Sequence, residues 1–209
     1  MLEAYLEALA SRPGSPAVAN PYRGPAGEAR LRNLRHYLTT VAEHGPAVAL
    51  IGEAPGYRGC AVTGIPFTSR QVLATDTGRW GLFVDRPYLA DAGLGEPWAE
   101  ATATIMWRHI LQLLPSPPLL GNAFPFHPHP ASHAASNRPL TADELAEGAG
   151  YLRHLLSLFP SVRVIAVGRQ AAHALGRIGV PPTAALRHPS HGGATTFAAG
   201  LRCATRDAA

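Results

Sequence analysis

Apolar residues follow two alternating patterns along the chain. Stretches with apolar residues at every third or fourth position are separated by short, nearly continuous apolar runs. The first pattern is typical of helices that pack one face against a core, and the second of buried strands. Helices are predicted over 2–10, from residue 28 to the stop signal at 44–46, and over 98–114, 141–159 and 169–179. Strands are predicted over 47–51, 118–124 and 162–168, with a last one at the start of 183–193.

The helix beginning near residue 141 has a clear start signal. Thr141 is followed three positions later by Glu144, which is the pattern of a capping box. The apolar residues of this helix fall on one side: Leu145, Leu152, Leu155, Leu156 and Phe159. We therefore expect it to pack on the core.

Helices and short strands that alternate along a chain imply parallel pairing with right-handed crossovers. The predicted class is α/β, a three-layer α/β/α sandwich around a central, mostly parallel, short-stranded sheet. At 209 residues the chain fits one domain, 1–209. Residues 1–25, a short helix followed by a segment rich in Pro and Gly, are expected to form an N-terminal arm on the surface.

The charge composition narrows the chemistry. All 18 basic side chains are Arg and none is Lys, so a P-loop lysine and a side-chain Schiff base are both impossible. A net charge of +4 suits a polyanionic partner such as nucleic acid. Cys60 and Cys203 are too few for a disulfide framework or a four-cysteine cluster, and we interpret them as free thiols.

Membrane and secretory signals are missing from the sequence. No apolar run reaches about 18 residues, the length needed to span a bilayer. Residues 1–16 carry two Glu and no basic cluster before their apolar residues, unlike a secretory signal. We expect a cytoplasmic protein.

Three polar residues follow predicted strands at the point where each strand ends. Glu53 follows 47–51, Asn122 lies at the end of the next apolar run, and His188 follows the last strand. Ligands of open α/β sheets bind beyond the carboxyl ends of the strands. These three side chains are therefore predicted to meet in one pocket.

The segments around these residues resemble a known motif set. Between residues 47 and 191 the chain contains GEAPG followed by GIPF, then LLGNAF, VIAVGRQAAHAL and RHPS. In order and spacing they resemble the uracil-DNA glycosylase superfamily, most closely the branch whose first motif begins Gly-Glu-Ala-Pro-Gly. Members of that branch often bind an iron–sulfur cluster through four cysteines, which this chain does not have.

The resemblance implies a role for each residue. Glu53 would stabilise the positive charge on the sugar and orient water. His188 would donate to the departing base, Asn122 would read the base edge, and Phe67 would stack on it. Backbone groups of the loop would also bind substrate; its members are Gly52, Ala54, Pro55, Gly56 and Tyr57.

The resemblance also implies DNA contacts. In relatives, the loop after the histidine motif enters the DNA, and here that stretch is SHGGATTF, residues 190–197. Predicted contacts are Ser190, His191, Gly192, Gly193 and Arg187, together with His127 and Arg138 lining the groove. Without a lysine amine, the enzyme should release the base and leave an abasic site uncut.

Two positions depart from the family pattern. Ala54 precedes Pro55, where many branches have Asp or Asn, so all of the acid function would fall on Glu53. Gly56 follows Pro55, where some members have a Tyr that blocks the thymine methyl group. Discrimination against thymine is therefore left open.

The sequence thus predicts a monomeric, monofunctional glycosylase that removes uracil, or another deaminated base, from DNA without metal or cofactor. One alternative is a module of the same fold, catalytically weakened through Ala54, that only binds damaged or single-stranded DNA. The other is a metal-dependent hydrolase that uses four histidines as ligands: His127, His129, His133 and His188.

Overall fold

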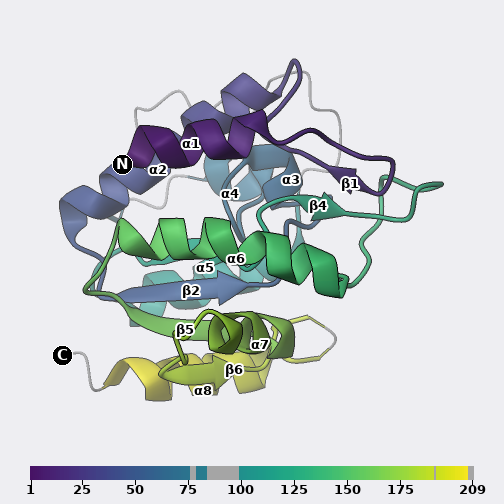
Figure 1. Cartoon of the computed structure of the whole chain (residues 1–209). Helices are drawn as coiled ribbons and strands as arrows, with labels where there is room; N and C mark the ends of the chain where they lie inside the picture. Colours follow the sequence, from purple (N-terminus) through teal and green to yellow (C-terminus); the bar gives the residue numbers. More distant parts are fainter. Residues whose placement is uncertain (76–78, 84–98, 191, 207–209) are drawn as a thin grey trace.

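The fold is built on a parallel sheet. A computed structural model describes residues 1–75, 79–83, 99–190 and 192–206. Four strands lie in the order β3-β2-β5-β6, and each neighbouring pair is parallel (Figure 1). Their bounds are Val48–Gly52 for β2, Leu119–Asn122 for β3, Arg163–Val167 for β5 and Ala184–Leu186 for β6. The predicted α/β class is confirmed.

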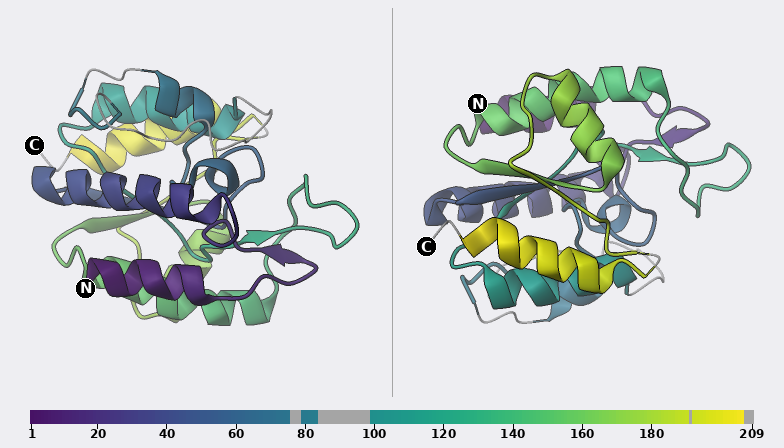
Figure 2. Two further views of the ribbon diagram at one scale, coloured as in Figure 1. Left: turned by 90° about the horizontal axis from the view of Figure 1, so that it is seen from above. Right: turned by 90° about the horizontal axis from the view of Figure 1, so that it is seen from below.

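Helices cover both faces of this sheet. In the two views of Figure 2, α6 (Ala142–Ser157) and α7 (Arg169–Arg177) lie on one face, and α5 (Ala101–Leu113) and α8 (Ala194–Arg206) lie on the other. The sheet between them is apolar: Leu50, Ile51 and Ile165 are completely buried. These strands read as continuous apolar runs because both of their faces are covered. The three-layer sandwich is therefore present as predicted.

Further helices complete the fold at the β3 side. α1 (Leu2–Ser11) packs on α6 and on α2 (Gly27–His44), and the Tyr37 hydroxyl of α2 donates to the carbonyl of Pro118, just before β3. Two short helices, α3 (Cys60–Thr63) and α4 (Arg70–Ala74), follow the loop after β2. None of the helices in the described ranges has the length and apolar character needed to span a membrane.

The N-terminal arm is built into the fold. Its short strand β1 (Val18–Ala19) pairs antiparallel with β4 (His127–Pro128). Val18 and Tyr22 are buried, at 4% and 3% exposure, so the arm contributes to the core. The side-chain amide of Asn20 donates to the carbonyls of Leu9 and Arg12, and these bonds hold the arm against the end of α1.

The capping box predicted at Thr141 and Glu144 is present in full at the start of α6.

The prediction of a loop over 190–197 is wrong for the second half of that segment. Helix α8 begins at Ala194, and its Phe197 and Leu201 are completely buried. This helix packs on α5 and β6. The ATTF part of the predicted DNA-contacting loop is therefore the first turn of a core helix, and only the residues before Ala194 are available as a loop.

Candidate functional site

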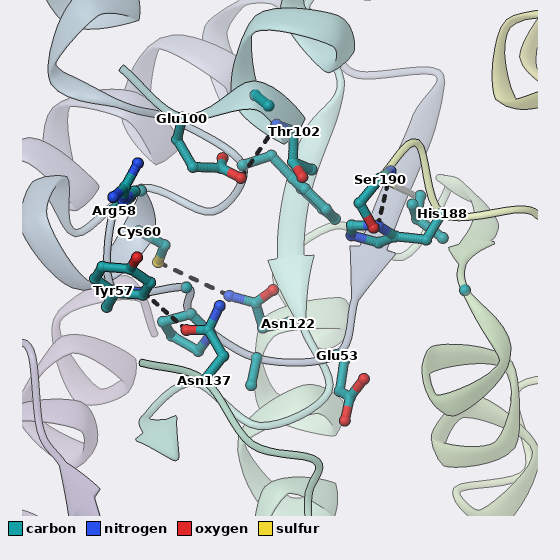
Figure 3. A pocket seen from close by; sticks show the side chains of 18 of the residues that line it. Glu53, Tyr57, Arg58, Cys60, Glu100, Thr102, Asn122, Asn137, His188 and Ser190 are labelled. Carbon is teal, nitrogen blue, oxygen red and sulfur yellow. Dashed lines mark hydrogen bonds between the residues drawn. The ribbon is translucent and has the colours of Figure 1, made fainter. Parts of the chain in front are cut away.

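A pocket of about 660 Å³ opens at the carboxyl edge of the sheet (Figure 3). The segments that follow β2, β3, β5 and β6 all contribute to its lining. Glu53, Asn122 and His188 are among the lining residues, together with Phe67. The sheet register explains the meeting, because Gly52 at the end of β2 pairs with Asn122 at the end of β3. The site predicted from three strand ends is thus assembled in one place.

Gly52 lets Phe67 enter the pocket. A Cβ atom at residue 52 would lie 2.4 Å from Cζ of Phe67 and 3.0 Å from Oδ1 of Asn122. Phe67 is 9% exposed and has a φ of 54°, a left-handed conformation that is costly for an aromatic residue. The residue that follows it is held firmly, since the Thr68 carbonyl accepts from the Thr63 hydroxyl and the Thr68 hydroxyl from Trp107 Nε1. Strain of this kind, maintained by surrounding bonds, is typical of functional sites.

Glu53 is half-buried and oriented by the backbone. Its Oε1 accepts from the N–H of Leu140 at 3.2 Å, while its own carbonyl accepts from the N–H of Phe124. Figure 3 shows its carboxylate lying apart from the amide of Asn122. The carboxylate is therefore anchored through one oxygen and lies apart from the amide of Asn122.

The segment 127–140 supports the loop that carries Glu53. Nδ1 of His127 lies 2.8 Å from the carbonyl oxygen of Pro55, and the N–H of Tyr57 donates to Oδ1 of Asn137 at 3.1 Å. The loop is thus held at Glu53, Pro55 and Tyr57 by one neighbouring segment. Asn137 was not identified from the sequence, because nothing in the local pattern indicates which distant loop it contacts.

His127, predicted from the sequence as a DNA contact, is buried. It is 3% exposed, and its Nε2 lies 3.1 Å from the carbonyl oxygen of Ala134. Burial lowers the pKa of its ring, against the opposing effect of the carbonyl contacts. Arg138 lines the pocket, as expected from the sequence, but its guanidinium makes a two-point pair with Glu144 and donates to the carbonyl of Ala17. Both side chains therefore brace the fold, and we leave them out of the proposed DNA contacts.

The histidine after β6 has a defined ring orientation. Nδ1 of His188 lies 3.3 Å from the backbone N of Ser190 and 2.7 Å from its Oγ. Because a backbone N–H can only donate, Nδ1 acts as acceptor, and a neutral ring then carries its proton on Nε2. Gly193 permits the tight turn, since a Cβ there would lie 2.1 Å from the carbonyl oxygen of His188. His191, another predicted contact, lies outside the described residues.

The amide of Asn122 has a sulfur partner. Nδ2 of Asn122 donates to Sγ of Cys60 at 3.8 Å, as Figure 3 shows. Cys60 lines the pocket and is 3% exposed, and burial raises its pKa to about 12, so it is a neutral thiol. The sequence identified Cys60 only as a free cysteine, because its neighbours Asn122 and Tyr22 are 62 and 38 residues away.

Several charged residues on the pocket lining were not identified from the sequence. Arg58 and Arg169 are exposed, and the Arg58 guanidinium lies 5.3 Å from the ring centroid of Tyr57. Glu100 also lines the pocket, but its carboxylate caps α5 by accepting from the N–H groups of Thr102 and Ala103. Of the two carboxylates that line the pocket within the described part of the chain, Glu53 is the one that does not cap a helix.

The ligand set of the metal-hydrolase alternative is not brought together. His127 and His129 stack with ring centroids 5.3 Å apart, whereas His133 is exposed on the following turn and His188 follows β6. Over the described ranges, no three His, Cys, Asp or Glu side chains are grouped as metal ligands would be. The geometry gives this alternative no support.

Comparisons with known proteins agree with the geometry. A family model described as the uracil DNA glycosylase superfamily matches residues 39–206, which include every strand of the sheet and the whole pocket. Among solved structures, the crystal structure of wild-type Pedobacter heparinus SMUG2 is similar, with a TM-score of 0.65 and 14% identity over 99% of this chain and 97% of that chain. At this identity the likeness shows a shared fold. A search of curated proteins found no match. Because the family model covers far more than half of its length, the chain belongs to the uracil DNA glycosylase superfamily.

Proposed function

We propose that this protein is a monofunctional DNA glycosylase that hydrolyses the N-glycosidic bond of uracil in DNA. The observation that carries the proposal is the meeting of Glu53, Asn122 and His188, from three separate strand ends, in one pocket that Phe67 also lines. A base inside a duplex cannot reach such a pocket, so the target nucleotide must be flipped out of the stack.

Glu53 acts on the sugar side of the bond. Breaking the bond develops positive charge on the sugar, as in glycoside hydrolysis. A carboxylate stabilises that charge and orients the attacking water. Leu140 holds one carboxylate oxygen, which leaves Oε2 to face the reacting centre. Ala54 supplies no second acid, so Glu53 carries this role alone.

His188 acts on the base side. The departing uracil gains negative charge on its ring oxygens, and a donor aimed at such an oxygen is typically worth about 2.7–4 kcal/mol. The Ser190 N–H directs the neutral ring of His188 to carry its proton on Nε2, which is the tautomer able to donate to the base.

Recognition uses an aromatic face, an amide and a basic rim. Phe67 stacks on the flipped base, which is worth about 1–3 kcal/mol by alanine substitution in comparable sites. Asn122 hydrogen-bonds its edge. Exposed Arg58, Arg169 and Arg187 supply positive charge for DNA phosphates, with Ser190, Gly192 and Gly193 in the loop before α8. With no lysine in the chain, the reaction ends at the abasic site.

The test is base release from an end-labelled oligonucleotide that contains one uracil, either single-stranded or placed opposite G or A. We expect strand cleavage only after mild alkali, and loss of that cleavage in Glu53→Gln. Strand cleavage without alkali would contradict the monofunctional assignment. Tight binding to uracil DNA with no base release would instead favour the binding-module alternative. Release of hypoxanthine, xanthine or mismatched thymine, but not of uracil, would change the substrate while keeping the chemistry.

A further inference from the structure

Two buried polar groups, the hydroxyl of Tyr22 and the thiol of Cys60, connect Asn122 to the backbone behind the pocket. The Tyr22 hydroxyl donates to the carbonyl oxygen of Gly64 at 2.9 Å. The same hydroxyl oxygen lies 4.0 Å from Sγ of Cys60, which in turn accepts from Nδ2 of Asn122 at 3.8 Å. Tyr22, Cys60 and Asn122 are 3%, 3% and 7% exposed. We call this series the Tyr22–Cys60 relay.

The relay has a defined direction. A backbone carbonyl can only accept, so the Tyr22 O–H must point at Gly64. Because the Tyr22 hydrogen is used toward Gly64, the Tyr22 oxygen can only accept from Cys60. The thiol hydrogen of Cys60 therefore points to the Tyr22 oxygen. The sulfur lone pairs are left for Asn122, and only the NH₂ side of the amide can meet them. Burial raises the pKa of both Tyr22 and Cys60, which keeps each hydrogen in place.

We propose that the Tyr22–Cys60 relay is a positioning device that fixes the amide orientation of Asn122 and thereby selects uracil over cytosine. The inference rests on the proposed function, which it deepens. With Nδ2 turned to Cys60, Oδ1 points away from the sulfur toward the open pocket (Figure 3). The second Nδ2 hydrogen remains beside it, so the amide presents an acceptor and a donor to the base.

That arrangement matches one pyrimidine and opposes the other. Uracil presents an N3–H donor next to its O4 acceptor, which pair with Oδ1 and Nδ2. Cytosine presents an N3 acceptor next to an amino donor, so both contacts become repulsive. A rotated amide would reverse the preference, because an amide side chain is nearly symmetric in shape. The selectivity therefore depends on whatever prevents rotation.

The sharpest variant is Tyr22→Phe, which keeps the ring and removes only the hydroxyl. The thiol of Cys60 is then able to turn and donate to Oδ1 of a rotated amide. The readout is binding to oligonucleotides carrying 2′-fluoro-deoxyuridine or 2′-fluoro-deoxycytidine, because the electron-withdrawing fluorine blocks bond cleavage and isolates recognition. We expect the uracil-to-cytosine affinity ratio to fall by roughly three- to tenfold, the worth of one hydrogen bond.

Tyr37→Phe is the matched control. Tyr37 is also fully buried, and its hydroxyl also donates to a backbone carbonyl, but that carbonyl is Pro118, at the opposite end of β3. Loss of a buried hydroxyl lowers stability in both variants, and thermal unfolding measures it. Only Tyr22→Phe should change the affinity ratio. An unchanged ratio in Tyr22→Phe, with wild type preferring uracil, would overturn the relay.

Cys60→Ala gives a second, independent arm. It removes both the acceptor for Nδ2 and the competing donor, so the amide has no partner in either orientation. We expect a lower uracil affinity and a lower ratio, again with Tyr37→Phe as reference. The two proposals fail separately. A wild-type protein that neither prefers the uracil analogue nor releases uracil would contradict the proposed function. If the wild type and the variants all prefer the uracil analogue to the same degree, only the relay is contradicted.

Discussion

At the residue scale, the site depends on side chains that are small or strained for a steric reason. Residue 52 is a glycine because the Phe67 ring occupies the space that a Cβ would need. Phe67 itself adopts a positive φ, which places its ring there. Similarly, the carbonyl oxygen of His188 occupies the space that a Cβ at residue 193 would need, so that position is a glycine. These residues carry no chemistry, but they determine where Phe67, Asn122 and His188 lie.

Gly52→Ala tests this packing. The new methyl group would overlap Cζ of Phe67 at 2.4 Å and press on the amide of Asn122 at 3.0 Å, so one or both must move. We expect kcat/KM for uracil release to fall by roughly 100-fold, as displacements of about 1 Å in active sites commonly do. Gly150→Ala is the control, because a Cβ there meets nothing within 4 Å. Normal activity in Gly52→Ala would mean that the position of Phe67 does not matter.

At the element scale, the segment 127–140 holds the loop that follows β2. It contacts the loop at three points, through His127 to Pro55, Asn137 to Tyr57 and Leu140 to Glu53. The arm residues Val18 and Ala19 pair with β4 at the start of the same segment. The N-terminal part of the chain therefore supports the loop after β2 through β4, although it is distant from that loop in sequence.

Asn137→Ala should loosen this support. The variant removes the acceptor of the Tyr57 N–H, and Asn137 is itself exposed, so folding should be little affected. We expect uracil release in single turnover to slow by roughly three- to tenfold, the worth of one hydrogen bond, with an unchanged melting temperature. Ser136→Ala is the neighbouring control, since the hydroxyl of Ser136 donates within the turn, to the carbonyl of His133. Equal rates of uracil release in the two variants would show that the hydrogen bond from Tyr57 to Asn137 does not support the loop.

At the scale of the whole molecule, two buried or paired groups make stability depend on pH in the same direction. Arg138 lowers the pKa of Glu144 below its ordinary value of 4.5. The ionised Glu144 contributes to the free energy of unfolding above about pH 4.5. This contribution is lost as the pH falls through the lower pKa that Glu144 has in the folded protein. Burial lowers the pKa of His127 from 6.5, so the unfolded chain takes up that proton first and stability begins to fall below about 6.5.

Glu144→Gln separates the two effects. The glutamine keeps an oxygen for the Thr141 N–H, so the capping box survives while the charge is lost. Urea unfolding at a series of pH values should show a less stable variant at pH 7, with the difference from wild type shrinking toward pH 3. The fall that begins below about 6.5 should persist, because His127 is intact. A constant difference at all pH values would rule out the ionised pair as its origin.

The extent to which sequence predicts this protein follows from the range of each interaction. The strands, the capping box at Thr141 and the meeting of Glu53, Asn122 and His188 could be predicted, because apolar runs and strand ends are local signals. Helix α8 was missed, since Phe197 and Leu201 reveal a buried face only once α5 and β6 are beside them. His127 was misplaced for the same reason, because its burial depends on Pro55 and Ala134.

The sequence by itself determined the α/β class, the edge of the sheet where chemistry is possible, and the exclusion of a lysine Schiff base. These follow from the periodicity of side chains and from which residue types are present. Only the tertiary structure decided which groups orient the site: Leu140 on Glu53, Ser190 on His188, and Tyr22 with Cys60 on Asn122. Hydrogen bonds between nitrogen and oxygen atoms act over only about 3 Å, and those to sulfur over slightly more, so residues far apart in the chain must be brought close together. Their partners therefore become definite only when the packed fold brings them within reach.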